Sequence, residues 1–395
     1  MKPHGNRAGR PSLRTGMTAV AALLALAAAG CASSHKAAGA SGTARAAAVT
    51  IDLTPQGCSP RPAKIPAGQV TFNVTNKNAG AVSEAELRTS DLEHILGEQE
   101  NLTPGLSGAF TLNVAPGRYT INCPGASRPH WTLTVAGKAT GPSWPSNAQL
   151  SAAVTGYSRY VDQNAAGLVT RTQAFCQAIN QGNMTQAQLL YPQARVYYER
   201  IEPVAEIWGS LDTQIDGRWE NPVTVASQFM GFHKLEQLMW QDNTLAGAPQ
   251  LCTGLVAHEQ QLLTLVQTAQ YNPLEMASGA TDLINEAATS KISGEEERYS
   301  NTDLPVLAAN VQGAMEVVAL LQPYLRQKDS SLLSLIQRRD ASVNQALAAY
   351  RSVPGYDGTG FVAYSAVLDS QRQQFAARIN ALAEAMSQVC AKVGP

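Results

Sequence analysis

Three segments in the second half of the chain carry carboxylates and an imidazole at spacings that suit metal binding. The first, Tyr198-Glu-Arg-Ile-Glu-Pro-Val-Ala-Glu206, places Glu199, Glu202 and Glu206 on one face of a helix. The second, Gly231-Phe-His-Lys-Leu-Glu236, carries His233 and Glu236 one helical turn apart among apolar residues. A histidine and a carboxylate in a buried segment cost free energy unless they are paired or bind a metal ion.

The third segment, from Ser290 to Asp303, crowds Glu295, Glu296 and Glu297 together, and Asp216 lies between the first two segments. Carboxylate oxygens with one imidazole suit iron or manganese, and zinc remains possible. Helical bundles commonly build such sites from inward-facing residues on facing helices. The alternative is a solvated acidic face beside a hydrogen-bonded histidine, and the spacing alone does not decide between the two.

A second cluster lies in the first half of the chain. Cys58 and Cys123 flank a stretch that contains the acidic and imidazole residues Glu84, Glu86, His94, Glu98 and Glu100. Two thiols with carboxylates or an imidazole could bind copper or another transition ion. A disulfide between the two cysteines is the alternative, and the sequence favours neither.

The elements that must position these residues differ between the two halves. Residues 48–136 contain short alternating segments at 70–75, 109–114, 118–122 and 131–135 with Pro/Gly turns between them, which predicts a small all-β sandwich. A Gly/Pro/Ser-rich linker is expected at 137–147. From residue 148 to 395, apolar residues recur at intervals of three and four, which predicts an all-α domain. Its helices are expected near 148–181, 187–209, 224–243, 249–270, 303–327, 330–351 and 362–391.

The N-terminus predicts export and a membrane anchor. Basic residues but no acidic ones precede a short apolar run that ends in Ala-Ala-Gly-Cys31, which is typical of a lipoprotein signal peptide at 1–30 with the lipid on Cys31. Small polar residues at 31–47 then form a flexible tether. We expect no later segment to span a membrane. Without residues 1–30 the chain keeps 25 basic and 30 acidic residues, which argues against a nucleic-acid partner.

The first two of these segments resemble the EfeO family of iron-uptake proteins. So does the stretch that contains most of the third, Ala288-Thr-Ser-Lys-Ile-Ser-Gly-Glu-Glu-Glu-Arg-Tyr-Ser300. The resemblance covers nearly all of the chain after the tether. It implies a cupredoxin-like sandwich followed by an imelysin-like helical domain with a His-x-x-Glu motif. It also implies an extracytoplasmic iron-binding protein, in the periplasm or on the outer face of the cell membrane, whose partners are a membrane iron permease and a secreted haem peroxidase.

The resemblance also implies two sets of metal ligands. In the helical domain the matching positions are Glu199, Glu202, Asp216, His233, Glu236 and a glutamate of the 295–297 run, with Glu296 favoured and Glu295 next. In the sandwich the matching positions are Cys58, Glu84 or Glu86, Glu98 and Cys123. No methionine follows Cys123 at the distance of a blue-copper site. We therefore expect a modified copper site, or none.

The cysteine count leaves a pairing problem. With Cys31 lipidated, five cysteines remain, so at least one is free, metal-bound or paired with another molecule. One disulfide is expected among Cys176, Cys252 and Cys390, with the C-terminal helix as a candidate for attachment to the bundle.

Two other functions stay open. One is an imelysin-like metallopeptidase, and the other is a ferroxidase, although di-iron bundles use Glu-x-x-His pairs on two helices. An iron carrier that is not an enzyme is the preferred interpretation.

Overall fold

The structure, a computed structural model, describes residues 47–92, 95–100, 102–137, 147–219, 226, 228–353 and 355–394. The expected signal peptide and Cys31 lie outside these residues, as do the tether before residue 47 and residues 138–146 of the linker. His94 lies outside them as well.

The β region (47–136) is a sandwich of two sheets with strand orders β2-β1-β4-β7 and β3-β9-β8-β5-β6. Apolar side chains from both sheets form one core, in which Phe72 and Phe110 stack at a centroid distance of 4.7 Å. The strands are β1 (Ala47–Leu53), β2 (Pro60–Arg61), β3 (Lys64–Pro66), β4 (Gly68–Asn76), β5 (Ala85–Thr89), β6 (Ile95–Gln99), β7 (Ser107–Val114), β8 (Gly117–Asn122) and β9 (His130–Ala136).

The four segments expected as strands are confirmed, since they lie in β4, β7, β8 and β9. The other five strands, β1, β2, β3, β5 and β6, were not predicted. Strand β5 alternates apolar and polar residues but is only five residues long and has no β-branched residue in its apolar positions, and β6 contains Gly97 and Glu98. Tertiary pairing therefore decides these two strands: β5 pairs with both β6 and β8.

The helical region (147–394) is built around one large apolar core. Its helices are α1 (Ala148–Asn180), α2 (Met184–Glu199), α3 (Glu202–Ala205), α4 (Gly209–Asp216), α5 (Gly231–Glu236), α6 (Ala248–Val266), α7 (Pro273–Thr289), α8 (Asp303–Lys328), α9 (Ser330–Ala348), α10 (Asp369–Met386) and α11 (Cys390–Val393). Short 3-10 turns are η1 (Glu206–Trp208), η3 (Lys291–Ser293), η4 (Tyr356–Gly358) and η5 (Tyr364–Ala366), and η2 (Gln237–Gln241) is a π-helical turn.

Several helix predictions need correction. The helix expected at 224–243 begins only at Gly231. The one expected at 362–391 begins at Asp369 and is interrupted at 387–389 before α11. The helix expected at 187–209 ends at Glu199, because Pro203 has no backbone N–H and its ring would clash with the Glu199 carbonyl. Glu199 and Glu202 therefore lie on different helices. Helix α7 was not predicted, although Asn272 caps it through the amides of Leu274 and Glu275, and Pro273 follows the cap.

The expectation that no later segment is apolar enough to span a membrane is also wrong in its literal form. Helix α8 is long and apolar enough by length and composition. However, 67% of its apolar window is buried within the protein, which is typical of a core helix. It packs on α1, α2, α7 and α9.

Two disulfides join described residues. Cys58 pairs with Cys123 inside the β region, and Cys176 on α1 pairs with Cys252 on α6. The disulfide expected among the last three cysteines therefore exists, but it joins two long helices of the bundle. Cys390 is not a free thiol either, so none of the described cysteines is left free.

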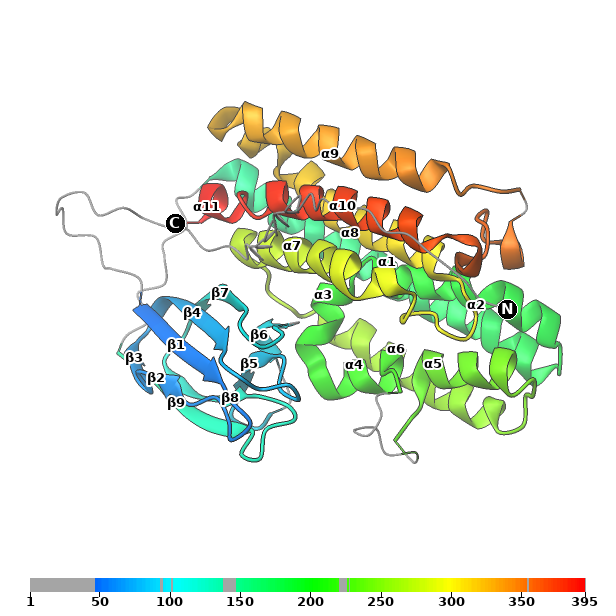
Figure 1. The fold of residues 1–395 in the computed structure, drawn as a ribbon, viewed down its shortest axis with the longest axis horizontal. Helices are drawn as coiled ribbons and strands as arrows, with labels where there is room; N and C mark the ends of the chain where they lie inside the picture. Colours follow the sequence, from blue (N-terminus) through cyan, green and yellow to red (C-terminus); the bar gives the residue numbers. More distant parts are fainter. Residues whose placement is uncertain are drawn as a thin grey trace, which may run out of the picture.

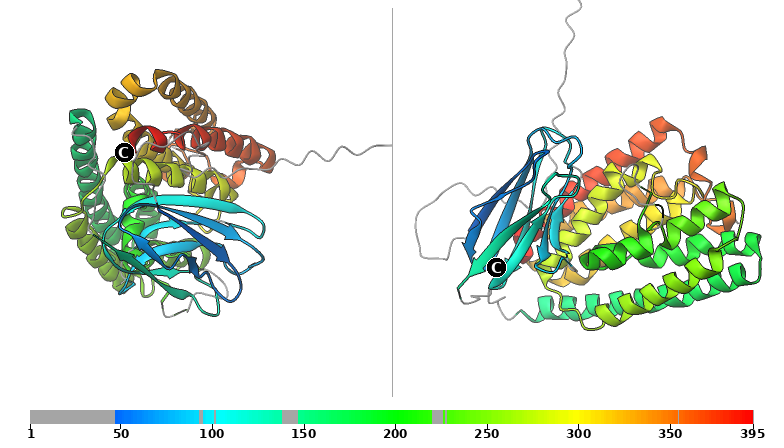
Figure 2. Two further views of the ribbon diagram at one scale, coloured as in Figure 1. Left: turned by 90° about the vertical axis from the view of Figure 1, so that its left-hand side faces the viewer. Right: turned by 90° about the horizontal axis from the view of Figure 1, so that it is seen from below.

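The β region lies at one end of the helical region (Figure 1), and the two further views in Figure 2 show the same arrangement. Strand β6 contacts η1, and β7 contacts α7. At this junction the Arg88 guanidinium fills the space where Gly209, the first residue of α4, has no side chain. The edge of the sheet that carries the acidic residues of β5 and β6 thus faces the helices that carry the bundle carboxylates.

Candidate metal centre

The ends of several helices converge on one buried acidic cluster. Six of its carboxylates are buried, and Glu286 on α7 is half-buried. The cluster contains Glu199 at the end of α2, Glu202 at the start of α3, Asp216 at the end of α4, Glu236 on α5, Glu286, and both Glu296 and Glu297 after η3, together with His233. Sequence positions up to 98 residues apart thus meet at one site.

Two glycines give the backbone the turns that this convergence needs. Gly231 has φ 74°, and a Cβ there would lie 2.1 Å from the carbonyl oxygen of Ile215. Only glycine permits this close approach between the start of α5 and the end of α4, which brings His233 beside Asp216. Gly294 has φ 86° and turns the chain from η3 into the Glu296–Glu297 segment.

His233 is held by one nitrogen, and its other nitrogen faces carboxylates. Its Nδ1 lies 3.1 Å from Oε2 of Glu236, whose Oε1 accepts hydrogen bonds from the backbone amides of Tyr299 and Ser300 at 3.0 and 2.8 Å. Nε2 of His233 is buried without a hydrogen-bond partner among the described residues. It lies 3.4 Å from Oδ1 of Asp216 and 3.6 Å from Oε1 of Glu296. Glu236 therefore orients the imidazole, as a carboxylate behind a metal-binding histidine does.

The donors fall into overlapping sets whose atoms lie within 4.8 Å of one another. Two of these sets matter below. The imidazole group consists of Asp216, His233 and Glu296, and the carboxylate group consists of Glu199, Glu202 and Glu296. A further set joins His233 and Glu236 with Glu297. The two named groups share Glu296, which makes this residue the centre of the cluster.

Two fully buried basic side chains neutralise part of this charge. Arg195, one helical turn before Glu199 on α2, forms ion pairs with Asp216, Glu199, Glu296 and Glu297. Lys291 in η3 donates to both oxygens of Glu202 at 2.5 and 2.6 Å, and to Oε2 of Glu199 at 3.2 Å. Both contact Glu296 as well, Arg195 at 3.0 Å and Lys291 at 3.8 Å.

These contacts decide the protonation states of the imidazole group. Burial raises the pKa of Asp216, but Arg195 and His233 outweigh it, so the pKa lies below its ordinary value. Burial likewise raises the pKa of Glu296, but Arg218 and Lys291 hold it well below its usual range. Burial lowers the pKa of His233, but Asp216 and the neighbouring hydrogen bonds raise it well above its usual value. These directions favour ionised carboxylates and a protonated imidazole in the cation-free site, so a metal ion that binds Nε2 of His233 must displace its proton.

The structure brings together most of the residues predicted for the helical site. Glu199, Glu202, Asp216, His233, Glu236 and Glu296 all belong to the cluster, whereas Glu295 is half-buried and belongs to none of the donor sets. Sequence reasoning placed Glu297 in the acidic run without favouring it, and it missed Glu286, Arg195 and the role of Lys291. The spacing of Arg195 four residues before Glu199 was a usable signal, because such pairs share a helix face.

The predicted ligands of the β region are arranged differently. The disulfide takes up both thiols, so neither Cys58 nor Cys123 offers a thiolate in this state, and their role as ligands stays a prediction for the reduced protein. Glu86 is buried and paired with Arg88, and it accepts a hydrogen bond of 2.7 Å from Asn122.

The other glutamates of the acidic stretch between Cys58 and Cys123 that the structure describes, Glu84, Glu98 and Glu100, are half-buried. Burial and Glu86 raise the pKa of Glu84 to about 7. Burial and Glu100 raise the pKa of Glu98 well above its usual range. Burial and Glu286 of α7 raise the pKa of Glu100, which shows that charges of the two regions influence each other across the junction.

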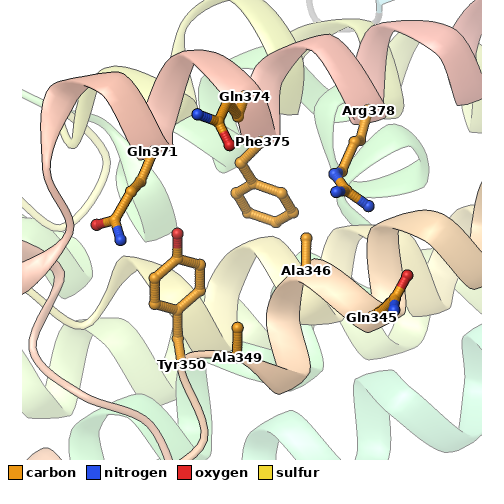
Figure 3. Close-up of a pocket in the computed structure, with 8 residues that line it drawn as sticks. All are labelled: Gln345, Ala346, Ala349, Tyr350, Gln371, Gln374, Phe375 and Arg378. Carbon is orange, nitrogen blue, oxygen red and sulfur yellow. The ribbon is translucent and has the colours of Figure 1, made fainter.

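The surface pocket between α9 and α10 is not part of this centre. The pocket has a volume of about 320 Å³. Figure 3 shows Tyr350 and Phe375 facing it, with Gln371, Gln374 and Arg378 on one side. Its lining contains no carboxylate and no imidazole, so it does not suit a cation.

Comparison with known proteins agrees with this architecture. Residues 153–389 match the imelysin family model, and residues 19–135 match the model of the cupredoxin-like domain. Proteins named iron uptake system component EfeO, from Yersinia pseudotuberculosis serotype I (strain IP32953) and Escherichia coli (strain K12), are each 36% identical over 350 residues. Those alignments cover 88% of this chain and 91% of the relative. The relative of the same name from Yersinia pestis is 36% identical over 352 residues, with the same coverage.

The fold and the site thus define a protein with an N-terminal cupredoxin-like sandwich and a C-terminal imelysin-like helical domain that holds a buried His/carboxylate centre. The chain belongs to the EfeO family.

Proposed function

We propose that this protein captures iron at the imidazole group of its helical domain and delivers the ion to a permease in the cell membrane. The observation that carries the proposal is the buried Nε2 of His233, which has no hydrogen-bond partner among the described residues and faces Asp216 and Glu296. One imidazole nitrogen with ionised carboxylate oxygens is a donor set that suits iron. The names of the relatives, iron uptake system components, support the same cargo.

The setting of the proposed function is extracytoplasmic. The basic and apolar N-terminal segment supports export, and Cys31 supports a lipid anchor on the membrane face. An anchor of this kind raises the local concentration of the iron-loaded domain near a membrane permease. A secreted haem peroxidase is the second partner in this proposal. The domain boundaries that we propose are 48–136 for the sandwich and 148–395 for the helical domain.

Anaerobic calorimetric titration with ferrous iron, and a parallel titration with ferric citrate, tests the proposal. The double variant His233→Ala, Glu236→Ala should lose binding of the ion that the unmodified protein binds, because it removes both the ligand nitrogen and the carboxylate that orients it. His130→Ala is the matched control, since His130 is exposed on β9. Unchanged binding in the double variant would show that the assigned site is wrong.

A metallopeptidase is the alternative, because imelysin-like proteins have been classed as peptidases. Such an enzyme needs an open metal position and a general base near it. In this site both oxygens of Glu236 already have partners, so the glutamate of the His-x-x-Glu motif is not free to act as that base. Metal-dependent cleavage of casein or of a peptide library by the purified protein would favour the enzyme over the carrier.

A ferroxidase is the third possibility. Di-iron bundles use a Glu-x-x-His pair on each of two helices, whereas the pair here has the reverse order. The proposed carrier should consume no oxygen beyond the uncatalysed rate when ferrous iron is added, and an oxygen electrode measures this directly.

A further inference from the structure

The carboxylate group (Glu199, Glu202 and Glu296) already holds a cation that belongs to the protein. The ammonium of Lys291 lies 2.5 and 2.6 Å from the two oxygens of Glu202, 3.2 Å from Oε2 of Glu199 and 3.8 Å from Oε1 of Glu296. It thus contacts each member of a donor set whose atoms lie close enough together to ligate one ion. Lys291 is fully buried, so this ammonium has exchanged water for carboxylates.

A second side chain, Asn310, holds glutamates of the carboxylate group around this lysine. Asn310 on α8 donates to Oε2 of Glu199 at 3.0 Å and to Oε2 of Glu202 at 3.1 Å. Its Oδ1 atom is buried without a hydrogen-bond partner among the residues that the structure describes. Asn310 therefore holds one oxygen of Glu199 and one of Glu202 by contacts that do not involve Lys291.

The backbone of the segment that carries Lys291 is held from outside the site. The Tyr364 hydroxyl donates to the carbonyl of Ile292 at 2.6 Å, and Arg372 Nη1 donates to the carbonyl of Ser293 at 2.8 Å. The Lys291 side chain, in contrast, is an unbranched chain with four rotatable bonds and a compact charge at its end. A change at this position therefore moves the ammonium and leaves the segment in place.

We propose that Lys291 is an internal competitor for the iron ion: its ammonium occupies the carboxylate group in the empty protein, leaves when the ion binds, and returns when the ion is handed over. This inference rests on the function proposed above and goes beyond it. Glu296 belongs to both groups, so an ion at the imidazole group binds a carboxylate that lies 3.8 Å from the ammonium. Repulsion between the ion and the nearby cations then favours departure of the cation that is fixed least firmly, which is Lys291. The returning lysine stabilises the emptied site, which lowers the free energy needed to release the ion.

The arginine of the site does not fit the same role. Arg195 makes ion pairs with four carboxylates at once, and its guanidinium lies 5.3 Å from the centre of the Phe232 ring. A planar group fixed by several partners loses all of these contacts when it moves. We therefore assign Arg195 a permanent structural charge and Lys291 the exchangeable one.

Anaerobic titration with ferrous iron at fixed pH tests the role of Lys291 in three variants. Lys291→Met keeps an unbranched side chain, shorter by the terminal nitrogen, and removes the charge. It should bind ferrous iron at least tenfold more tightly, with slower release to a chelator, since the apparent affinity of the unmodified protein is reduced by the fraction of sites that the lysine occupies. Lys291→Arg keeps the charge and should bind no more tightly than the unmodified protein. Lys234→Met is the matched control, because Lys234 follows His233 in the chain but its ammonium contacts Gln237 and the Phe229 ring instead of the carboxylate group. A tenfold gain in this control as well would attribute the effect to net charge and overturn the inference.

A second measurement on the unmodified protein covers the case in which Lys291→Met does not fold. A buried, hydrogen-bonded ammonium gives a slowly exchanging side-chain NMR signal. The signal that is present in the unmodified protein and absent from Lys291→Arg is that of Lys291. Addition of diamagnetic Zn²⁺ should remove or shift this signal.

The outcomes separate this inference from the proposed function. If the unmodified protein binds ferrous iron but Lys291→Met binds it equally or more weakly, and the lysine signal is unchanged by Zn²⁺, only the competitor role is wrong. If the unmodified protein binds neither ferrous nor ferric iron, the proposed function fails and the inference fails with it.

Discussion

Nε2 of His233 lies 3.4 Å from Oδ1 of Asp216, although 17 residues separate them in the chain. The contact depends on the backbone, because α5 starts at Gly231 directly against the end of α4. Asp216 in turn is paired with Arg195, and His233 with Glu236. The imidazole and the carboxylate that we assign to iron are thus each fixed by a partner that is not itself needed as a ligand.

Gly231→Ala should weaken iron binding without touching a ligand. A Cβ at this position would lie 2.1 Å from the Ile215 carbonyl oxygen, so α5 must move away from α4 and carry His233 with it. We expect a loss of affinity of at least tenfold in calorimetric titration. Gly254→Ala, in the middle of α6 with open space around the added methyl group, is the control and should bind normally. Normal binding by Gly231→Ala would mean that this contact does not position His233.

Arg195→Met should destabilise the protein by about 3–5 kcal/mol, because removal of one partner leaves buried carboxylates without their cation. Four carboxylates lose an ion pair in this variant. Urea unfolding at neutral pH measures the change. Arg200→Met, which removes a partly exposed arginine bonded to Gln312, should cost less than about 1 kcal/mol. Equal stability of the two variants would contradict the structural role of Arg195.

Glu259→Gln should make stability less dependent on pH. Glu259 on α6 is fully buried and accepts one hydrogen bond of 2.8 Å from Thr172, and burial raises its pKa from 4.5 to about 8. Its folded-state pKa is raised, so the stability it contributes is present below about pH 4.5 and is lost as pH rises toward 8. At pH 7 the variant should be more stable by on the order of 2–3 kcal/mol.

The measurement for Glu259 is urea unfolding of both proteins at pH 4.5, 6 and 7.5. The difference in unfolding free energy between variant and unmodified protein should be small at the lowest pH and should grow toward the highest. A constant difference across the three values would show that folding does not raise the pKa of this carboxyl.

Loss of the Cys176–Cys252 disulfide should lower stability and leave iron binding intact. The bond joins α1 and α6 across 76 residues of sequence, and neither cysteine belongs to the donor sets. The double variant Cys176→Ser, Cys252→Ser should lose about 2–5 kcal/mol. Its affinity for ferrous iron, measured well below the unfolding midpoint, should equal that of the unmodified protein. A large loss of affinity would show that the disulfide shapes the site.

Part of this architecture could be predicted from the sequence. The three-and-four periodicity located α1, α8 and α9 almost to the residue, since these long helices bury one continuous stripe or their whole surface. The His-x-x-Glu spacing, together with Glu199, Glu202 and Glu296 of the first and third segments, pointed to residues that the structure brings together in one buried cluster. These signals are local, and local periodicity is what a sequence displays most directly.

Helix α7 carried usable local signals as well. Asn272 and Pro273 mark its start, and its buried residues Leu274, Ala277, Ala280 and Ile284 recur at intervals of three and four.

The charged part of the site depends on contacts that local periodicity does not carry. The inward direction of Lys291 was not predictable, because charged side chains are almost always exposed unless a partner is present. For Arg195 the four-residue spacing to Glu199 was a signal of a partner, but it did not show that the pair is buried. Both residues also have partners on helices far away in sequence, and only the assembled fold shows those contacts.

The central claim is that iron binds to His233, Asp216 and Glu296. A crystal of the protein soaked anaerobically with ferrous iron, with anomalous scattering recorded at the iron edge, tests it most directly. We predict an anomalous peak bonded to Nε2 of His233 and to carboxylate oxygens of Asp216 and Glu296, with the Lys291 ammonium withdrawn from Glu202. A peak elsewhere in the protein, with none at these three residues, would contradict the assignment.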